Sequence, residues 1–257
     1  GLTIKNVCIT TGAAECLTVA FKAFAHGKVV GIPRGYWENY VNAVILGGGI
    51  GAVVDYFDSE GNLDLPGLAQ QVAQENITIL LANFPNNPTG SVLTEEEAAA
   101  FAAFCRERDL LVIGDEVYNR LRYDGLRPMT LLKLMPERVV CLSSASKEFL
   151  MPGARVGYTV CAREAYPDKV MRKLVRANTA SPNVPGQKLL LKMIQDDLTD
   201  LRAGREPAMI VKVREEMGRR KRALVKVLIA HGFAMLGRAG HDPQGTIFLM
   251  SSLPAWW

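Results

Sequence analysis

Histidine, long apolar runs and a strong net charge are all scarce in this sequence. Only three of its 257 residues are histidine, which argues against a histidine-based metal site. No stretch of about 18 uncharged apolar residues occurs and no signal peptide is visible, so we expect no membrane span. The formal net charge of +4 is too small to indicate a nucleic acid or membrane partner.

The cysteines follow neither a metal-binding nor a disulfide pattern. There are five of them, an odd number, and no CxxC pair occurs. Most lie in apolar runs, which is typical of buried, reduced thiols. We therefore expect a cytoplasmic protein. The five are Cys8, Cys16, Cys105, Cys141 and Cys161.

The composition is that of an ordinary globular protein. Hydrophobic residues make up 49% and charged residues 22%, which argues against disorder. The length suits one large α/β domain, or one domain plus part of another. The chain starts in a loop before a strand and stops close to a strand, so both ends look interrupted. We expect part of a large domain to precede residue 1 and the rest of a small domain to follow residue 257.

Short apolar runs alternate with longer amphipathic stretches over the first 160 or so residues. This alternation is typical of βαβ units and of a mainly parallel sheet. Thr94 and the glutamates after it indicate a helix start, because a hydroxyl caps free N–H groups and carboxylates suit the positive helix end. The expected strands are Val7–Thr10, Val29–Ile32, Ala52–Tyr56, Ile77–Asn83, Leu110–Gly114, Val139–Ser143 and Val156–Val160.

Helical patterns lie between these strands and then follow one another after Tyr166. The predicted fold is α/β: a mainly parallel seven-stranded sheet flanked by helices, with the start of a smaller C-terminal α/β domain. Residues 1–205 form the large domain, and residues 206–257 form a long connecting helix and the start of the small one. The expected helices are Ala13–Ala25, Trp37–Leu46, Leu65–Gln74, Glu95–Arg108, Asp168–Ala177, Gln187–Arg202 and Ala208–His231.

The most specific motif follows the apolar strand that ends near Ser143. It contains Ser144, Ser146 and Lys147, and then Pro152-Gly153-Ala154-Arg155. A lysine at a strand end can form an imine with an aldehyde cofactor. An arginine eight residues further on can hold a phosphate through two parallel hydrogen bonds. Alone, such a lysine is more often an ordinary surface residue, so the whole pattern carries the inference.

Three further motifs also stand where expected strands end, the edge at which open α/β sheets bind ligands. Asp115, in Gly114-Asp115-Glu116-Val117-Tyr118, can bond a protonated pyridine nitrogen, although an acid there can also simply cap a loop. The string from Asn83 to Gly90 forms a rigid turn that can present an Asn amide. Thr10-Thr11-Gly12-Ala13-Ala14 opens a helix whose free N–H groups can receive a phosphate.

Together these motifs resemble the class I/II aminotransferases, which have the fold type I of enzymes that use pyridoxal 5′-phosphate (PLP). The resemblance runs from about Val7 to Gln187, and the Lys147 segment, NNPTG and DEVY are its specific parts. It implies that Lys147 forms a Schiff base with PLP and later moves a proton. It also implies that Asp115 pairs with the pyridine nitrogen.

The resemblance extends to the rest of the site. Tyr118 and Asn87 would bond the phenolic oxygen, and Trp37, with Tyr36 as the alternative, would stack on the ring. Trp37 and Asn87 would also contact the substrate. The implied catalytic residues are Lys147, Asp115 and Tyr118. The implied cofactor-binding set is Gly12, Ala13, Ala14, Trp37, Asn87, Asp115, Tyr118, Ser144, Ser146, Lys147 and Arg155.

The implied activity is transfer of an amino group between an amino acid and a 2-oxo acid, in a homodimer with shared active sites. The same constellation occurs in PLP-dependent lyases, cyclases and oxidases, and a PLP-sensing domain of a transcription regulator is a further alternative. A glycine-rich stretch, Leu46 to Ala52, approximates a dinucleotide fingerprint. It precedes a strand rather than a helix, so we interpret it as a turn.

Overall fold

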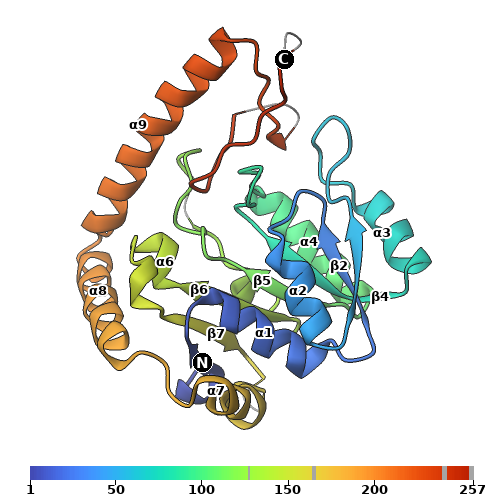
Figure 1. Cartoon of the computed structure of the whole chain (residues 1–257), viewed down its shortest axis with the longest axis vertical. Helices are drawn as coiled ribbons and strands as arrows, with labels where there is room; N and C mark the ends of the chain where they lie inside the picture. Colours follow the sequence, from blue (N-terminus) through green and yellow to red (C-terminus); the bar gives the residue numbers. More distant parts are fainter. Residues whose placement is uncertain (127, 164–165, 239–241, 255–257) are drawn as a thin grey trace.

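A computed structural model describes residues 1–126, 128–163, 166–238 and 242–254. Its centre is one seven-stranded sheet with the order β1-β7-β6-β5-β4-β2-β3 (Figure 1). The strands are β1 (Val7–Thr10), β2 (Val29–Pro33), β3 (Ile50–Val54), β4 (Ile77–Asn83), β5 (Leu111–Asp115), β6 (Val139–Ser144) and β7 (Gly157–Cys161).

Strand β7 is antiparallel to both of its neighbours, β1 and β6, and the other pairs are parallel. This confirms the predicted mainly parallel sheet of seven strands. Because parallel strands finish at the same edge, the carboxyl ends of β2, β4, β5 and β6 meet there. Strand β1 ends at the same edge, because Thr10 and Ser144 both pair with Gly157. The residues that the sequence singled out follow β1 and these four strands.

Helices cover both faces of the sheet. The α-helices are α1 (Ala13–Phe24), α2 (Asn39–Leu46), α3 (Leu65–Gln74), α4 (Glu95–Glu107), α5 (Leu131–Leu134), α6 (Ala145–Glu148), α7 (Arg172–Thr179), α8 (Val184–Arg202) and α9 (Ala208–Ala230). Two 3₁₀ turns, η1 (Ile4–Asn6) and η2 (Pro152–Ala154), and one π-helix, η3 (Tyr166–Met171), complete the set.

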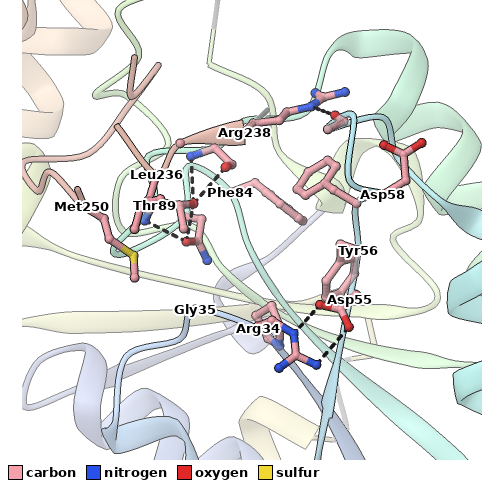
Figure 2. A pocket seen from close by; sticks show the side chains of 16 residues that line it. Arg34, Gly35, Asp55, Tyr56, Asp58, Phe84, Thr89, Leu236, Arg238 and Met250 are labelled. Atoms are coloured by element: carbon pink, nitrogen blue, oxygen red, sulfur yellow. Dashed lines mark hydrogen bonds and ion pairs between the residues drawn. The ribbon is translucent and has the colours of Figure 1, made fainter. Parts of the chain in front are cut away.

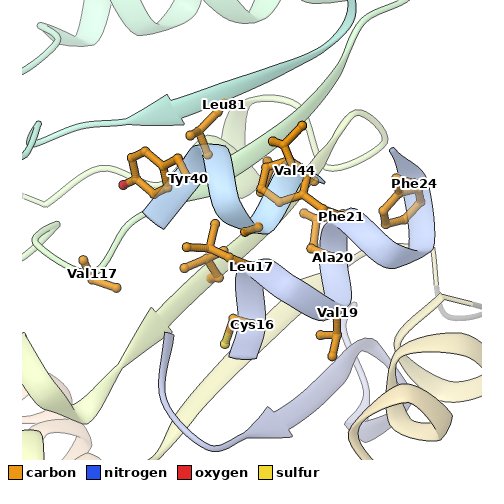
Figure 3. Close-up of a cluster of buried hydrophobic side chains, with 14 of the residues drawn as sticks. Cys16, Leu17, Val19, Ala20, Phe21, Phe24, Tyr40, Val44, Leu81 and Val117 are labelled. Atoms are coloured by element: carbon orange, nitrogen blue, oxygen red, sulfur yellow. The ribbon is translucent and has the colours of Figure 1, made fainter. Parts of the chain in front are cut away.

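Strand β4 shows how the core is divided between the two faces. Ile79 and Leu81 point into a cluster with α1, α2 and α7, part of which Figure 3 shows. Leu80 and Ala82 point into a second cluster with α3, α4 and α5. A central parallel strand buried on both sides needs such a continuous apolar sequence, which explains why ITILLAN lacks polar alternation.

Most element boundaries agree with the sequence prediction within two residues. The predicted start of α4 is confirmed: the Thr94 hydroxyl accepts from the N–H of Glu97, and the Glu97 carboxylate accepts from the N–H of Thr94. Strand β3 ends two residues earlier than predicted, because its pairing with β2 runs from Val29–Ile50 to Pro33–Val54. The helix predicted from Asp168 instead begins as η3, and α7 follows from Arg172.

The chain beyond α9 turns back toward the strand ends (Figure 1). We call residues 233–238 and 242–254 the C-terminal segment. Gly245 forms an antiparallel bridge with Arg122, and the Arg238 guanidinium, largely buried, pairs with Glu97 at the start of α4. Arg238 also lies over the Phe57 ring, 4.7 Å from its centroid. The predicted boundary at residue 205 falls between α8 and α9, and the division into two domains stays a prediction.

The described ranges contain neither a membrane-spanning helix nor a metal-binding cluster of side chains. No helix there combines the length and apolar content needed to cross a membrane. No group of three or more His, Cys, Asp or Glu side chains in those ranges could hold a metal ion.

Candidate active site

Asp115 is the most deeply buried acid at the strand ends, with only 2% of its surface exposed. The Tyr40 hydroxyl donates to one of its carboxylate oxygens at 2.7 Å, and the backbone N–H of Val117 donates to the other at 3.2 Å. Burial raises the pKa of Asp115 from 3.8 to about 6, although both donors and the Lys147 charge oppose the rise. The carboxyl is therefore mostly ionised at neutral pH, and its proton affinity depends on its neighbours.

Lys147 is half-buried on α6, the single turn that follows β6. Burial lowers the pKa of its amine, and the nearby Asp115 charge opposes that fall. The ammonium nitrogen lies 5.6 Å from the centroid of the Tyr118 ring and 5.4 Å from that of Phe248. Partial burial leaves more of the neutral, nucleophilic amine at a given pH than free lysine has.

The NNPTG loop is tied to the end of β5. Asn83 pairs with Asp115 across the two strands, and its amide donates to the Asp115 carbonyl at 2.9 Å. The Asn83 side-chain oxygen accepts from the backbone N–H of Asn87 at 2.8 Å. Two hydrogen bonds therefore connect Asn87 to Asp115, and the half-buried Asn87 side chain is held at the same edge.

Trp37 is connected to this edge by its contact with Tyr40 on α2. Its ring packs edge-to-face on the Tyr40 ring, with centroids 5.7 Å apart. Figure 3 shows Tyr40 at the border of the apolar cluster formed by α1 and α2. Tyr36 is also half-buried and packs on that cluster. The choice between Trp37 and Tyr36 as the stacking residue stays a prediction.

Gly12 and Arg155 come together at the start of α1. Gly12 has φ +83°, a conformation that favours glycine, and a Cβ at this position would lie 2.4 Å from an Arg155 nitrogen. The same guanidinium group donates to the Thr11 carbonyl at 3.4 Å and to the Pro152 carbonyl at 3.1 Å. A bare glycine thus leaves room for the exposed arginine beside the free N–H groups of a twelve-residue helix.

Ser144 supplies a buried polar atom close to that helix start. Its hydroxyl oxygen is buried and has no hydrogen-bond partner within the described part of the chain. Ser144 pairs across the sheet with Gly157, where a Cβ would lie 2.9 Å from the Ala13 nitrogen. A buried hydroxyl without a partner costs free energy, which favours a ligand that would accept its hydrogen bond.

The other predicted phosphate contacts are placed less tightly. Ser146 is half-buried on α6, Ala13 is half-buried in the first turn of α1, and Ala14 is exposed. The structure brings the segments of these residues to one edge. Their individual roles stay predictions.

Sequence reasoning missed two residues of this site. Tyr40 lies three residues after Trp37, and in the predicted helix Trp37–Leu46 that spacing could have marked it as a second aromatic on the same face. Phe248 comes from the C-terminal segment, and its ring meets that of Tyr118 at right angles, with centroids 6.1 Å apart. No local pattern connects residue 248 with residue 118.

A separate cavity lies beside the site, between the loops after β2, β3 and β4 and the C-terminal segment (Figure 2). Its walls are mainly apolar: Tyr56, Phe57, Phe84, Leu236 and Met250. The cavity adjoins the site. Gly35 and Asn86 line it, and in the sequence they directly precede the Tyr36–Trp37 pair and Asn87.

Tyr40→Phe should raise the pKa of Asp115 further, because it removes a hydrogen bond to the charged carboxylate. We expect the pKa to rise by about one to two units, since a hydrogen bond to a charged group contributes about 1.5–3 kcal/mol. Carboxyl carbon-13 NMR shifts followed over pH would measure it. Tyr56→Phe is the matched control: Tyr56 is also buried, but its hydroxyl donates to the Leu81 carbonyl. Equal Asp115 titration in Tyr40→Phe and wild type would contradict the assignment.

Comparison with known proteins places this geometry in a family. The aspartate/prephenate aminotransferase of Thermus thermophilus is 28% identical over 250 residues, which cover 97% of this chain and 61% of that protein. The aspartate aminotransferase of Pyrococcus abyssi is 30% identical, over 95% of this chain and 60% of that protein. The chain thus spans about three fifths of the length of these relatives.

Solved structures agree with the sequence matches. Thermus thermophilus aspartate aminotransferase with maleate superposes with a TM-score of 0.81 at 28% identity, covering 95% of this chain and 60% of that chain. N-succinyldiaminopimelate aminotransferase from Mycobacterium tuberculosis gives 0.81 at 27% identity, with the same coverage of 95% and 60%. The sequence profile named "Aminotransferase class I and II" matches residues 2–255. The chain therefore belongs to the class I and II aminotransferase family, with the PLP fold type I.

Proposed function

We propose that this chain is the cofactor-binding part of a PLP-dependent aminotransferase, which moves an amino group between an amino acid and a 2-oxo acid. One observation carries the proposal: the half-buried amine of Lys147 and the buried carboxylate of Asp115 interact across neighbouring strand ends. The Tyr118 ring faces the Lys147 amine, and Trp37 packs on Tyr40, whose hydroxyl donates to Asp115. This is the arrangement that a cationic aromatic ring with an aldehyde would need.

The residues around this edge fit PLP. Ser144 has a buried hydroxyl without a partner, and Gly12 leaves space beside the Arg155 guanidinium. A phosphate could take hydrogen bonds from both groups and from the free N–H groups at the start of α1. We propose Ser146 and the Ala13 and Ala14 amides as further phosphate contacts.

When bound, PLP would withdraw electrons from the α-carbon of an amino acid. Asp115, ionised at neutral pH, would hold a proton on the ring nitrogen and so maintain that withdrawal. Tyr40 and the Val117 N–H keep its carboxylate oriented and charged. Burial raises the pKa of the Tyr118 phenol above its usual range, so its hydroxyl stays protonated and can donate to a phenolate oxygen.

Lys147 is the group placed to bond the aldehyde and, once displaced, to take and return a proton at the substrate α-carbon. Its lowered pKa favours the neutral amine for both tasks. We propose that Asn87 and Trp37 contact cofactor and substrate together. The apolar cavity beside them could receive a substrate side chain.

The remaining assignments are proposals of the same kind. Family membership supports a homodimer with shared active sites. Five free and buried cysteines support a reducing, cytoplasmic location. The change from a sheet with helices to the long α9 supports separate domains at residues 1–205 and 206–257.

The test combines cofactor and product analysis. PLP added to the protein should give a visible absorbance band, and borohydride should fix the cofactor on the peptide that contains Lys147. With an amino acid and a 2-oxo acid, the expected products are a new amino acid and a new oxo acid in equal amounts. Release of ammonia would indicate a lyase or an oxidase, and a cyclic product would indicate a cyclase. Fixation without any turnover would favour a sensing domain.

A further inference from the structure

The short helix that carries Lys147 has little intrinsic stability. Helix α6 has only four residues, and a single turn fixes several backbone angles for very few hydrogen bonds. Leu150, two residues beyond the helix, has φ +52°, which is strained for a branched side chain. Contacts from other elements must therefore hold this turn, and with it the Lys147 amine, in place.

Arg120 contacts both residues that follow Lys147. Its guanidinium lies over the Phe149 ring, 5.2 Å from the centroid. Its charge and its backbone N–H both lie beside the Glu148 carboxyl and stabilise the ionised form of that group. Phe149 is 5% exposed and Glu148 6%, so solvent screens these contacts little.

The same guanidinium reaches a third element. Arg120 pairs with Asp197 on α8 at 2.5 Å, and both side chains are more than four-fifths buried. Leu190, on the same helix, packs with Ala145 and Phe149 of the α6 region. Arg120 itself stands two residues after Tyr118, whose ring faces the Lys147 ammonium. One side chain thus links the Tyr118 loop, α6 and α8.

Several acidic groups surround this link, and Arg120 is the cation among them. Burial raises the pKa of Glu148 to about 8, Arg120 opposes that rise, and the neighbouring Glu116 and Asp197 add to it. Glu148 is therefore mostly protonated at neutral pH, and the buried ion pair of the link is that of Arg120 with Asp197. Removal of the cation would leave Asp197 buried without its partner, beside the turn that carries Lys147.

We propose that Arg120 is a positioning residue for Lys147: through Phe149, Glu148 and Asp197 it fixes the lysine-bearing turn against the loop that carries Tyr118. This proposal rests on the proposed role of Lys147 as the amine that bonds PLP. The contacts of Arg120 are with Phe149 beside the lysine-bearing turn and with Asp197 on α8. The proposed effect of Arg120 is therefore on where the amine stands.

The experiment separates binding from reaction. Pyridoxine 5′-phosphate has an alcohol in place of the aldehyde, so its dissociation constant reports on the pocket alone. The rate at which borohydride-fixable PLP appears on Lys147 reports on the position of the amine. In Arg120→Met, which keeps an apolar stem on Phe149, we expect that rate to fall about 10- to 100-fold. The dissociation constant of pyridoxine 5′-phosphate should change by less than about threefold, which is less than about 0.7 kcal/mol.

Conservative and control variants complete the test. Arg120→Lys keeps the charge and should recover a large part of the rate, with the same pH dependence of fixation as wild type. Arg106→Met removes an exposed arginine that pairs with Glu137, and it should behave as wild type. Circular dichroism would confirm folding of each variant. If Arg120→Met does not fold, Arg120→Lys and Asp197→Asn decide, with slower fixation at unchanged binding expected.

An unchanged fixation rate in folded Arg120→Met, or in Asp197→Asn where Arg120→Met does not fold, would overturn the positioning role. Parallel losses of binding and rate would overturn it too, because they would mean general damage to the pocket. Failure of the wild-type protein to fix PLP on Lys147 is a different outcome, because it contradicts the proposed function itself.

Discussion

Lys147→Ala should abolish the covalent link to PLP and lower turnover at least about a thousandfold, because one amine serves as both nucleophile and proton carrier. The visible absorbance band should disappear, and borohydride should leave no cofactor mass on the protein. The substitution leaves Ser144 and Arg155, the proposed phosphate contacts, in place, so PLP should still bind reversibly. Mass spectrometry after borohydride treatment and steady-state kinetics would measure these effects.

The control for this variant is Lys133→Ala. Lys133 is an exposed lysine on α5, shortly before β6 in the sequence. Its removal should change neither fixation nor turnover. Retained turnover in Lys147→Ala would remove the proposed role of the amine. Fixation on another lysine in the wild type would do the same.

Asp115→Asn should lower turnover about 100-fold or more and change how stability depends on pH. The folded protein holds the Asp115 proton more tightly than the unfolded chain, since burial raises the pKa from 3.8 to about 6. The contribution of Asp115 to wild-type stability should therefore fall as pH rises from about 4 to about 6, and asparagine should remove that contribution. The difference between the two proteins is on the order of 3 kcal/mol.

Urea unfolding of the ligand-free proteins between pH 4 and pH 7 would measure this difference. All other titrating groups are shared, so subtracting the two curves isolates Asp115. Asp55→Asn is the control, because it also removes one acid, but an exposed one that pairs with Arg34. A pH-independent difference for Asp115→Asn would show that burial does not raise this pKa. Wild-type turnover in Asp115→Asn would contradict its role at the ring nitrogen.

The opposing effects of Asp115 on stability and function have a common origin. A carboxylate buried next to Tyr40 is costly in the ligand-free protein, and a cationic ring would neutralise it. Sites that bind charged groups often carry such a cost. Tyr40 is fully buried, and its hydroxyl donates to one carboxylate oxygen of Asp115. This hydrogen bond fixes the orientation of the carboxylate.

Much of the fold and the main site residues could be predicted because their signals are local. Apolar runs such as ITILLAN specify buried strands, and the residue after each run must lie at a strand end. Asp115 and Lys147 therefore fall on one edge once the sheet is parallel. The sequence did not predict that β7 is antiparallel. Its apolar run resembles those of the parallel strands, and its direction depends on how residues 145–156 turn.

The remainder depends on tertiary contacts between distant residues. Tyr40 and Asp115 are 75 positions apart, and only the packing of α2 on the sheet brings them together. Phe248 meets Lys147 because the chain returns after α9, and Arg120 meets α6 and α8 through side-chain packing. No periodicity in one stretch of sequence contains such information.

Glu97 takes part in two contacts that can form at very different times during synthesis. Its bond with Thr94 spans three residues and can form as soon as that turn leaves the ribosome. Its pairing with Arg238 spans 141 residues and must wait until the C-terminal segment exists. The start of α4 can therefore be folded before the C-terminal segment is made. That segment can then bind to it when the Arg238 guanidinium reaches the Glu97 carboxylate.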